Sequence, residues 1–338
     1  MIKYLVTGAA GHLGFNVVKK LVESKKQVKA FVLPNDKNVE NLPKEVDICY
    51  GNVTSTEDVN KLFEHKNNEE LIVIHCAGIV TIATKFDQLT YDVNVIGTKN
   101  IVDACIKNEV KRLVYISSVH AIRELPNKEV ISETKDFNSN GVIRLYAKTK
   151  AEATKYVLDN VENGLDAVVI HPSGIAGPYD YGHGHITQLI TDFYKGGLTA
   201  GVKGGYDFVD VRDVADGIIT AAIKGKKGEC YILSNKFFEV RELIDTFAKV
   251  TNKKTIKTYL PLWFAKLTAP LAELYYKLLK QTPLYTKYSL YTLQSNSNFS
   301  HKKATKELNY NPRPFEETIK DTITFLKDIN RIWNFNIF

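Results

Sequence analysis

Short apolar runs alternate with amphipathic helical patterns through the first half of the chain. Strands that are buried on both faces of a parallel sheet read as nearly continuous apolar runs. Six such runs are predicted as strands, at Lys3–Thr7, Val28–Leu33, Asp47–Tyr50, Leu71–His75, Arg112–Ser117 and Ala167–His171. Helices are predicted between them, at Leu13–Ser24, Ser55–Phe63, Tyr91–Asn108 and Leu145–Asn160. This alternation predicts an α/β fold with a doubly wound parallel sheet.

The pattern changes after Pro172, where irregular, glycine-rich stretches such as "HPSGIAGPYDYGHGH" replace the alternation. We expect residues 1–171 to form a Rossmann domain, to which the chain returns at about residues 206–235. Residues 172–205 and 236–330 are expected to form a smaller, mostly helical domain. The segment Ser300–Lys327 has two prolines followed by an amphipathic pattern, which predicts a helix. For the aromatic tail, "RIWNFNIF", a packed end strand and a disordered end are both open.

Composition narrows the class of protein. The 338 residues are 44% hydrophobic and 25% charged, which is ordinary for a globular protein of one large or two modest domains. The net charge of +7 comes from scattered lysines without an arginine-rich block, so we expect no nucleic-acid partner. No uncharged apolar run reaches the ~18 residues of a membrane span, and the first strand begins too early for a signal peptide. Four widely spaced cysteines argue against a metal site and against disulfides, and they fit a reducing, cytoplasmic location.

Three glycines mark the turn from the first strand to the first helix in "VTGAAGHLG". Gly8 is suited to the backbone angles of a tight turn, and Gly11 would let a pyrophosphate approach the backbone. Gly14 would let the helix pack closely on the sheet. The N-terminus of the helix offers free N–H groups and a partial positive charge to an anion. We therefore expect a phosphate-bearing dinucleotide here, with His12 and Leu13 beside it; a tight turn without a ligand is the alternative.

A second motif, "YAKTK", places Tyr146 and Lys150 on one face of a predicted helix. A free tyrosine has a pKa of about 10, and a neighbouring ammonium lowers that pKa by stabilising the phenolate. Tyr146 could then exchange a proton with a substrate hydroxyl or carbonyl group. On its own the pair is also common in helices without any such role. Upstream, "YISSVHA" puts Ser117 and Ser118 at the tip of a predicted strand, where open α/β sheets bind ligands.

The glycine turn, the strand-tip serine and YxxxK, in this order, resemble the extended short-chain dehydrogenase/reductase superfamily, which includes the NAD-dependent epimerase/dehydratase family. The segments "GNVTS", "HCAG", "NVIGTKN", "HPSGIAGP" and "FVDVRDVADG" also match its pattern. The chain looks most like the dihydroflavonol-4-reductase and 3β-hydroxysteroid-dehydrogenase branch, over roughly residues 1–325.

The resemblance implies a Ser-Tyr-Lys catalytic set. Tyr146 would be the acid/base, Lys150 would lower its pKa and hold the nicotinamide ribose, and Ser118 would orient the substrate oxygen. Ser117 is the alternative if the alignment is off by one, and Asn94 would order its helix or relay a proton. The implied cofactor contacts are the turn residues Gly8, Gly11, His12, Leu13 and Gly14, then Leu33 at the end of the second strand, Asn52 and Val53 near the adenine, Ala77 and Gly78 at the ribose, Pro172 and Ser173 at the nicotinamide, and Ser117, Tyr146 and Lys150.

The choice between NAD and NADP stays open. Similar proteins carry an acid at the position of Val32, which favours NAD, or an arginine at the position of Leu33, which favours NADP. This chain has neither residue. Asp36 and Lys37 follow shortly in the sequence. The acidic side chain would favour NAD and the basic one NADP.

Two departures from the family pattern bear on the substrate. Sugar-nucleotide epimerases carry an asparagine at the position of Gly174, and the dehydratases carry an acid at the position of His120. We therefore expect hydride transfer on a small-molecule carbonyl or secondary alcohol, with a sugar-nucleotide epimerase/dehydratase and a non-catalytic cofactor sensor as alternatives. A homodimer is compatible with the resemblance. Aromatic residues of the second half are expected either to face an apolar or ring-bearing substrate or to pack in the core and a lid: Phe193, Tyr194, Tyr206, Phe208, Trp263, Phe264, Tyr275 and Tyr276.

Overall fold

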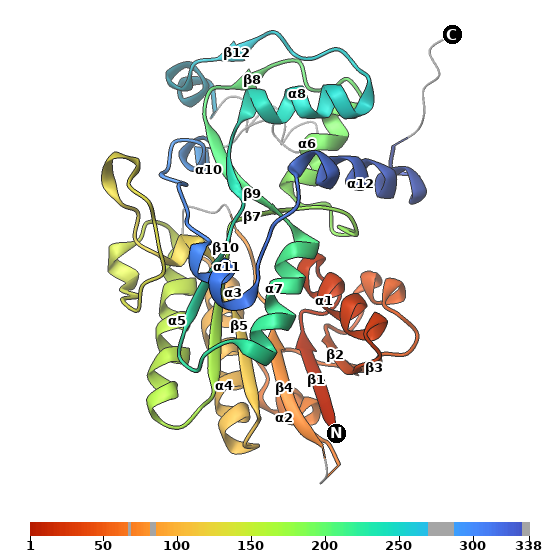
Figure 1. Cartoon of the computed structure of the whole chain (residues 1–338), viewed down its shortest axis with the longest axis vertical. Coiled ribbons are helices and arrows are strands. Elements are labelled where there is room, and N and C mark those ends of the chain that lie inside the picture. Colours follow the sequence, from red (N-terminus) through yellow and green to blue (C-terminus); the bar gives the residue numbers. More distant parts are fainter. Residues whose placement is uncertain (67–68, 82–85, 270–286, 333–338) are drawn as a thin grey trace.

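The computed structural model describes residues 1–66, 69–81, 86–269 and 287–332 (Figure 1). Its main sheet has seven strands in the order β10-β6-β5-β4-β1-β2-β3, and every neighbouring pair is parallel. The strands are β1 (Ile2–Thr7), β2 (Gln27–Val32), β3 (Asp47–Tyr50), β4 (Glu70–His75), β5 (Arg112–Ile116), β6 (Ala167–Pro172) and β10 (Cys230–Leu233). The six predicted strands are confirmed to within one residue at each end. The strand order reverses between β1 and β4, which is where such sheets open a binding crevice.

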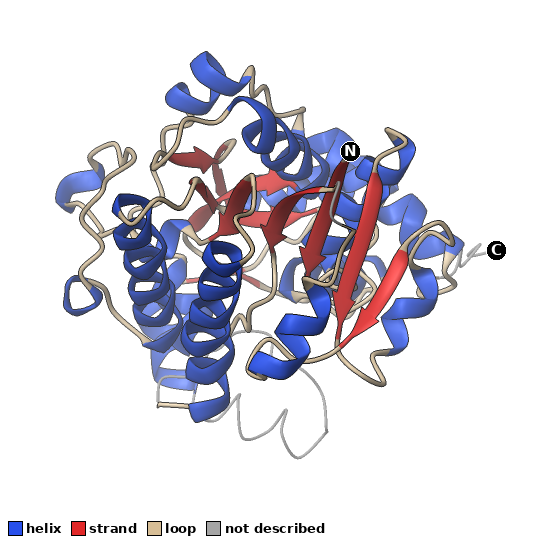
Figure 2. Cartoon of the chain, turned by 90° about the horizontal axis from the view of Figure 1, so that it is seen from below, coloured by secondary structure: helices blue, strands red, loops and turns tan. Residues whose placement is uncertain are grey.

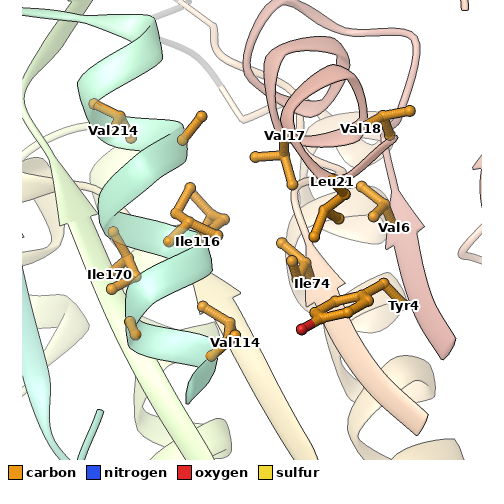
Figure 3. Close-up of a cluster of buried hydrophobic side chains, with 14 of the residues drawn as sticks. Tyr4, Val6, Val17, Val18, Leu21, Ile74, Val114, Ile116, Ile170 and Val214 are labelled. Carbon is orange, nitrogen blue, oxygen red and sulfur yellow. The ribbon is translucent and has the colours of Figure 1, made fainter. Parts of the chain in front are cut away.

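Helices cover both faces of this sheet (Figure 2). One face carries α1 (His12–Glu23) and α7 (Val211–Lys224), and the other carries α2 (Thr56–Leu62), α4 (Gly97–Lys107) and α5 (Leu145–Glu162). Strand side chains alternate between the faces, so Tyr4 and Val6 pack under α1 while Leu5 joins the opposite layer. Figure 3 shows the side chains of α1 and α7 packed on strands β1, β4, β5 and β6. The doubly wound Rossmann fold is therefore confirmed.

The helix that the sequence predicts at Tyr91–Asn108 consists of three pieces. It begins earlier, as α3 (Gln88–Tyr91), because the Asp87 carboxylate caps it by accepting a hydrogen bond from the Thr90 N–H. A π-helical turn over Asp92–Ile96 then leads into α4. Such turns insert one extra residue and often occur at functional sites. Here the turn carries Asn94, whose side chain is fully buried.

The second half of the chain builds a smaller layer above the carboxyl ends of the main strands (Figure 1). Strands β7 (Gly174–Ala176), β9 (Gly205–Asp210) and β11 (Lys236–Glu239) form a second sheet, and β8 (Gly201–Val202) pairs with β12 (Tyr259–Leu260). Among the described residues, the helices of this layer are α6 (His185–Tyr194), α8 (Val240–Thr251), α10 (Lys287–Thr292) and α12 (Phe315–Asp328), of which α12 confirms the helix predicted after the prolines. Helix α11 (Lys302–Leu308) packs with α7 on the main sheet.

Ion pairs join this layer to α7. Arg313 donates two hydrogen bonds to the Asp213 carboxylate, and Arg212 binds Asp321 of α12. The division into two domains and a homodimer both stay predictions. Tyr275, Tyr276 and the last six residues of the aromatic tail lie outside the described residues. Within the described part of the chain, no helix combines the length and the apolar character needed to span a bilayer.

Candidate active site

The glycine turn has the geometry that a pyrophosphate requires. Gly8 has φ of +63°, and a Cβ on it would lie 2.7 Å from the Ala77 nitrogen. A Cβ on Gly14 would collide with the carbonyl oxygen of Gly8. Helix α1 begins after Gly11, its first turn holds no acidic residue, and no side chain among the described residues caps it. The Gly11 N–H donates to the Gly8 carbonyl oxygen, whereas the first N–H groups of α1 are left to bind an anion, so the residues present fit a dinucleotide.

His12 has a contact that the sequence did not predict. Its Nε2 donates a 3.0 Å hydrogen bond to the carbonyl oxygen of Pro178, which follows β7. The imidazole thus holds a loop of the second layer against the start of α1 and does not simply face solvent. Leu13 packs against the core beneath the turn.

The residues implied near the adenine lie at the ends of β2 and β3, which are neighbours in the sheet. Leu33 is 53% exposed. Asn52 accepts a hydrogen bond from the Thr54 N–H, and Val53 is buried against α4. The Asp36 carboxylate accepts a hydrogen bond from the Asn38 N–H. Asp36 therefore caps its own 3-10 turn.

Lys150 reaches the carboxyl end of β5 from helix α5. Its Nζ donates a 2.7 Å hydrogen bond to the carbonyl oxygen of Ile116 and lies 5.1 Å from the centre of the Tyr115 ring. Burial lowers the pKa of Lys150 to about 8. A Cβ on Gly78 would lie 3.3 Å from this Nζ and 3.2 Å from Asn94 Oδ1, so a glycine leaves room between the two groups.

Tyr146 lies one turn before Lys150 and is also buried. The His120 ring meets the Tyr146 ring edge-on at 6.1 Å, and the His120 N–H donates a 3.2 Å hydrogen bond to Ser118 Oγ. His120 therefore contacts both Ser118 and Tyr146. The residue before the helix, Arg144, has φ of +82° and ψ of 154°, a strained conformation of the kind that clusters at functional sites.

Ser117 has a different role from its neighbour. Thr154 donates its hydroxyl proton to the Lys150 carbonyl oxygen, so the Ser117 hydroxyl donates the 2.6 Å bond to Thr154 Oγ1. Ser117 thus ties β5 to α5, and this placement favours Ser118 as the residue that orients a substrate.

Ser173 follows Pro172 at the end of β6 and donates a hydrogen bond to Asp207 of β9. The Asn235 N–H donates to the same carboxylate oxygen, at 3.1 Å. Burial raises the pKa of Asp207 to about 6, against the effect of these two bonds. The sequence analysis missed Asp207, although an acid between Tyr206 and Phe208 in an apolar strand was a visible signal.

A cavity of about 180 Å³ lies beside the start of α5. Its apolar walls include Ile122, Val142, Ile143, Ala147, Tyr206 and Phe299. The Tyr206 hydroxyl bonds to His120 Nε2 at 3.0 Å, and the two rings stack. Burial lowers the pKa of His120 to about 4, so its imidazole is neutral at pH 7.

The other aromatic residues singled out from the sequence do not line this cavity, as far as the structure describes them. Phe193 and Tyr194 pack in the core beneath α6, and Phe208 packs against Phe315. Trp263 is largely exposed. In the described ranges, histidine, cysteine and acidic side chains form no group of three that could hold a metal ion.

Comparisons with known proteins agree with this geometry. The model of the NAD-dependent epimerase/dehydratase family matches residues 4–234. Sterol demethylase protein B of Methylococcus capsulatus is 26% identical over 328 residues, covering 96% of this chain and 98% of that protein. The putative dihydroflavonol 4-reductase of Synechocystis sp. is 30% identical over 284 residues, covering 80% and 81%. The 3 beta-hydroxysteroid dehydrogenase type 7 of Mus musculus is 28% identical over 364 residues, covering 96% and 95%.

Among solved structures, the crystal structure of gox2253 is similar with a TM-score of 0.82 and 27% identity, covering 98% of this chain and 99% of that one. The matches confirm the resemblance to the reductase and steroid-dehydrogenase branch, and with it the expected enzyme class and nicotinamide cofactor. The chain belongs to the NAD-dependent epimerase/dehydratase family of enzymes.

Proposed function

We propose that this protein is an NAD(P)-dependent oxidoreductase that interconverts a carbonyl group and a secondary alcohol on a neutral, ring-bearing small molecule. The observation that supports the proposal is the placement of Lys150 on the carbonyl oxygen of Ile116, one helical turn from Tyr146. His120 contacts the Tyr146 ring and binds Ser118 Oγ beside them. When it is bound, the nicotinamide donates or accepts the hydride. The protein then has to position the substrate oxygen and move one proton.

Tyr146 supplies the proton to the carbonyl oxygen during reduction, and it accepts that proton during oxidation. Lys150, with its pKa near 8, is mostly protonated at pH 7, and its positive charge stabilises the phenolate that the proton transfer creates. Ser118 Oγ accepts a hydrogen bond from the His120 N–H, so the Ser118 hydroxyl proton remains available to the substrate oxygen.

The cavity supports a neutral, ring-bearing substrate. Arg123 is the one lysine or arginine among the described residues that line it. Glu124, Ser295 and Asn296 add polar groups to its apolar and aromatic side chains. The charges of a sugar diphosphate usually require several cationic or N–H donors. His120 and Tyr206 offer neutral polar groups in their place. The relatives named for dihydroflavonol and hydroxysteroid chemistry act on ring-bearing molecules, in agreement with this reading.

The test is a titration with NADH and NADPH, followed by a screen of ring-bearing ketones and aldehydes that monitors nicotinamide absorbance. Tyr146→Phe should lower kcat about 100-fold or more while cofactor affinity stays nearly unchanged. Tyr156→Phe is the matched control, because Tyr156 lies on the same helix and binds Asp103 at the surface. Full activity of the Tyr146→Phe variant would contradict the proposal. Stabilisation and epimerisation of a UDP- or GDP-sugar would establish the epimerase alternative.

A further inference from the structure

A buried chain of hydrogen bonds runs through His75, a residue to which the mechanism above gives no role. His75 and Thr7 are cross-strand partners at the ends of β4 and β1. Thr7 Oγ1 lies 2.6 Å from His75 Nδ1, and Thr98 Oγ1 of α4 lies 3.1 Å from His75 Nε2. All three side chains are at most 1% exposed, so water cannot replace these partners.

The donor and the acceptor of each hydrogen bond in this series follow from the contacts at its two ends. The Thr98 hydroxyl donates its proton to the carbonyl oxygen of Asn94 at 2.7 Å, so Thr98 Oγ1 can only accept from His75. His75 Nε2 therefore carries the proton, and Nδ1 accepts the hydroxyl proton of Thr7. At the other end, the Ala77 N–H donates to Thr7 Oγ1 at 3.2 Å. The opposite tautomer would leave the Thr7 hydroxyl proton without this acceptor, and it would set two acceptors, His75 Nε2 and Thr98 Oγ1, against each other.

Each end of this chain of hydrogen bonds connects to loop 77–79, in which the resemblance implies Ala77 and Gly78 as cofactor contacts. The Thr7 end fixes Ala77, whose backbone lies against Gly8 of the glycine turn. The Thr98 end fixes the π-helical turn that presents Asn94. The Asn94 side chain in turn binds both the N–H and the carbonyl group of Ile79, at 2.7 and 3.0 Å. Loop 77–79 is thus held at both ends by groups that meet at one imidazole.

We propose that His75 is a positioning residue for the dinucleotide, acting as a neutral imidazole protonated at Nε2 that aligns the glycine turn with loop 77–79. The role toward the cofactor rests on the function proposed above, whereas the tautomer does not. Loss of the imidazole leaves two buried hydroxyl groups without their partner and frees both segments to move. The expected consequence is weaker cofactor binding with little change in the chemical step.

Nitrogen NMR of the histidine rings in the cofactor-free protein tests the tautomer. The His75 signals, assigned by their absence from the His75→Gln variant, should show a protonated Nε2 and a bare Nδ1 between pH 6 and 9. Thr98→Val removes the acceptor of the Nε2 proton and should shift that signal. A proton on Nδ1, or a His75 ring that titrates in this range, would overturn the proposal.

Variants test the role toward the cofactor. His75→Phe should raise the Kd for the preferred dinucleotide about tenfold, with kcat at saturating cofactor within about threefold of the wild type. His75→Gln keeps one acceptor and one donor and should restore most of the affinity. A matching loss of kcat, or equal affinities for the Phe and Gln variants and the wild type, would overturn the positioning role.

If His75→Phe does not fold, the Thr7→Val and Thr98→Val variants provide the same test. Their effects on cofactor affinity should be coupled in the presence of His75, because the two hydroxyls communicate only through its ring. Simple additivity of the two effects would contradict the proposal. A wild-type protein that binds neither NADH nor NADPH would overturn the proposed function and the cofactor role together, while the NMR result on the tautomer would stand by itself.

Discussion

Lys150 Nζ donates a 2.7 Å hydrogen bond to the carbonyl oxygen of Ile116, the last residue of β5. The bond ties the helix that carries Tyr146 to the carboxyl end of a central strand. It also keeps the ammonium group out of water, and this burial lowers the pKa of Lys150 to about 8. The position that the amine needs for its proposed role therefore costs the fold some stability.

Replacing Lys150 should separate the proposed role of its amine in the reaction from the cost of burying that amine to the stability of the fold. Between pH 8 and 10.5 the unfolded chain binds this proton and the folded protein does not, so the wild type should gain stability as the pH rises through this window. Lys150→Met should lack this gain and should be as stable as the wild type at pH 7, or more stable by up to about 3 kcal/mol, yet inactive. Urea unfolding at pH 7 and pH 9.5 measures the difference. Lys148→Met, an exposed change on the same helix, is the control, and an Lys150→Met variant that loses stability at pH 7 would contradict the prediction.

Asp207 should show the opposite dependence on pH. Its folded-state pKa near 6 lies above the usual 3.8, so the folded protein binds the extra proton between pH 4 and 6 and stability falls as the pH rises through that window. Asp207→Asn keeps an oxygen for Ser173 and Asn235 and should be more stable at pH 7.5, by at most about 3 kcal/mol. Thermal unfolding from pH 4 to 8 checks this. Asp159→Asn, at an exposed carboxylate, should leave the pH profile unchanged.

The fold and the placement of Tyr146 and Lys150 on one helix were predictable because their signals are local. Continuous apolar runs marked the strands, and the spacing of four between Tyr146 and Lys150 put both side chains on one helix face. The contacts of Asp207 and His75 were not predictable in this way. Ser173 and Asp207 are 34 positions apart, and Thr7 and His75 are 68 apart. Such partners depend on strand order and register, which hydrophobic periodicity does not contain.

The π-helical turn at Asn94 shows the same limit. The apolar pattern predicted one helix over Tyr91–Asn108, because one extra residue barely disturbs a helical period. His12 is another case, since its partner Pro178 belongs to a loop of the second layer. In both cases the sequence identified the segment correctly but not the direction of the side chain.

Substitution of Leu33 should change the preference between NADH and NADPH. Leu33 stands at the end of β2 and is 53% exposed, and the nearby Asp36 carboxylate caps its own 3-10 turn. Leu33→Arg should raise the preference for NADPH over NADH about tenfold, because a guanidinium can bind the 2′-phosphate and screening limits the gain at an exposed site. Ratios of kcat/KM for the two cofactors measure the effect. Leu33→Gln should change the ratio far less, and an equal shift in both variants would show that charge is not the cause.

Gly141 gives access to the proposed substrate cavity without disturbing the fold. It lines the cavity, and a Cβ on it would come no closer than 3.9 Å to any atom. Gly141→Leu should therefore leave thermal stability nearly unchanged but fill part of the 180 Å³ space. We expect kcat/KM to fall about tenfold or more for ring-bearing ketones and much less for small aldehydes such as propanal. Gly141→Ala should have a small effect on both substrate groups. Equal losses for large and small substrates would mean that this cavity does not hold the ring.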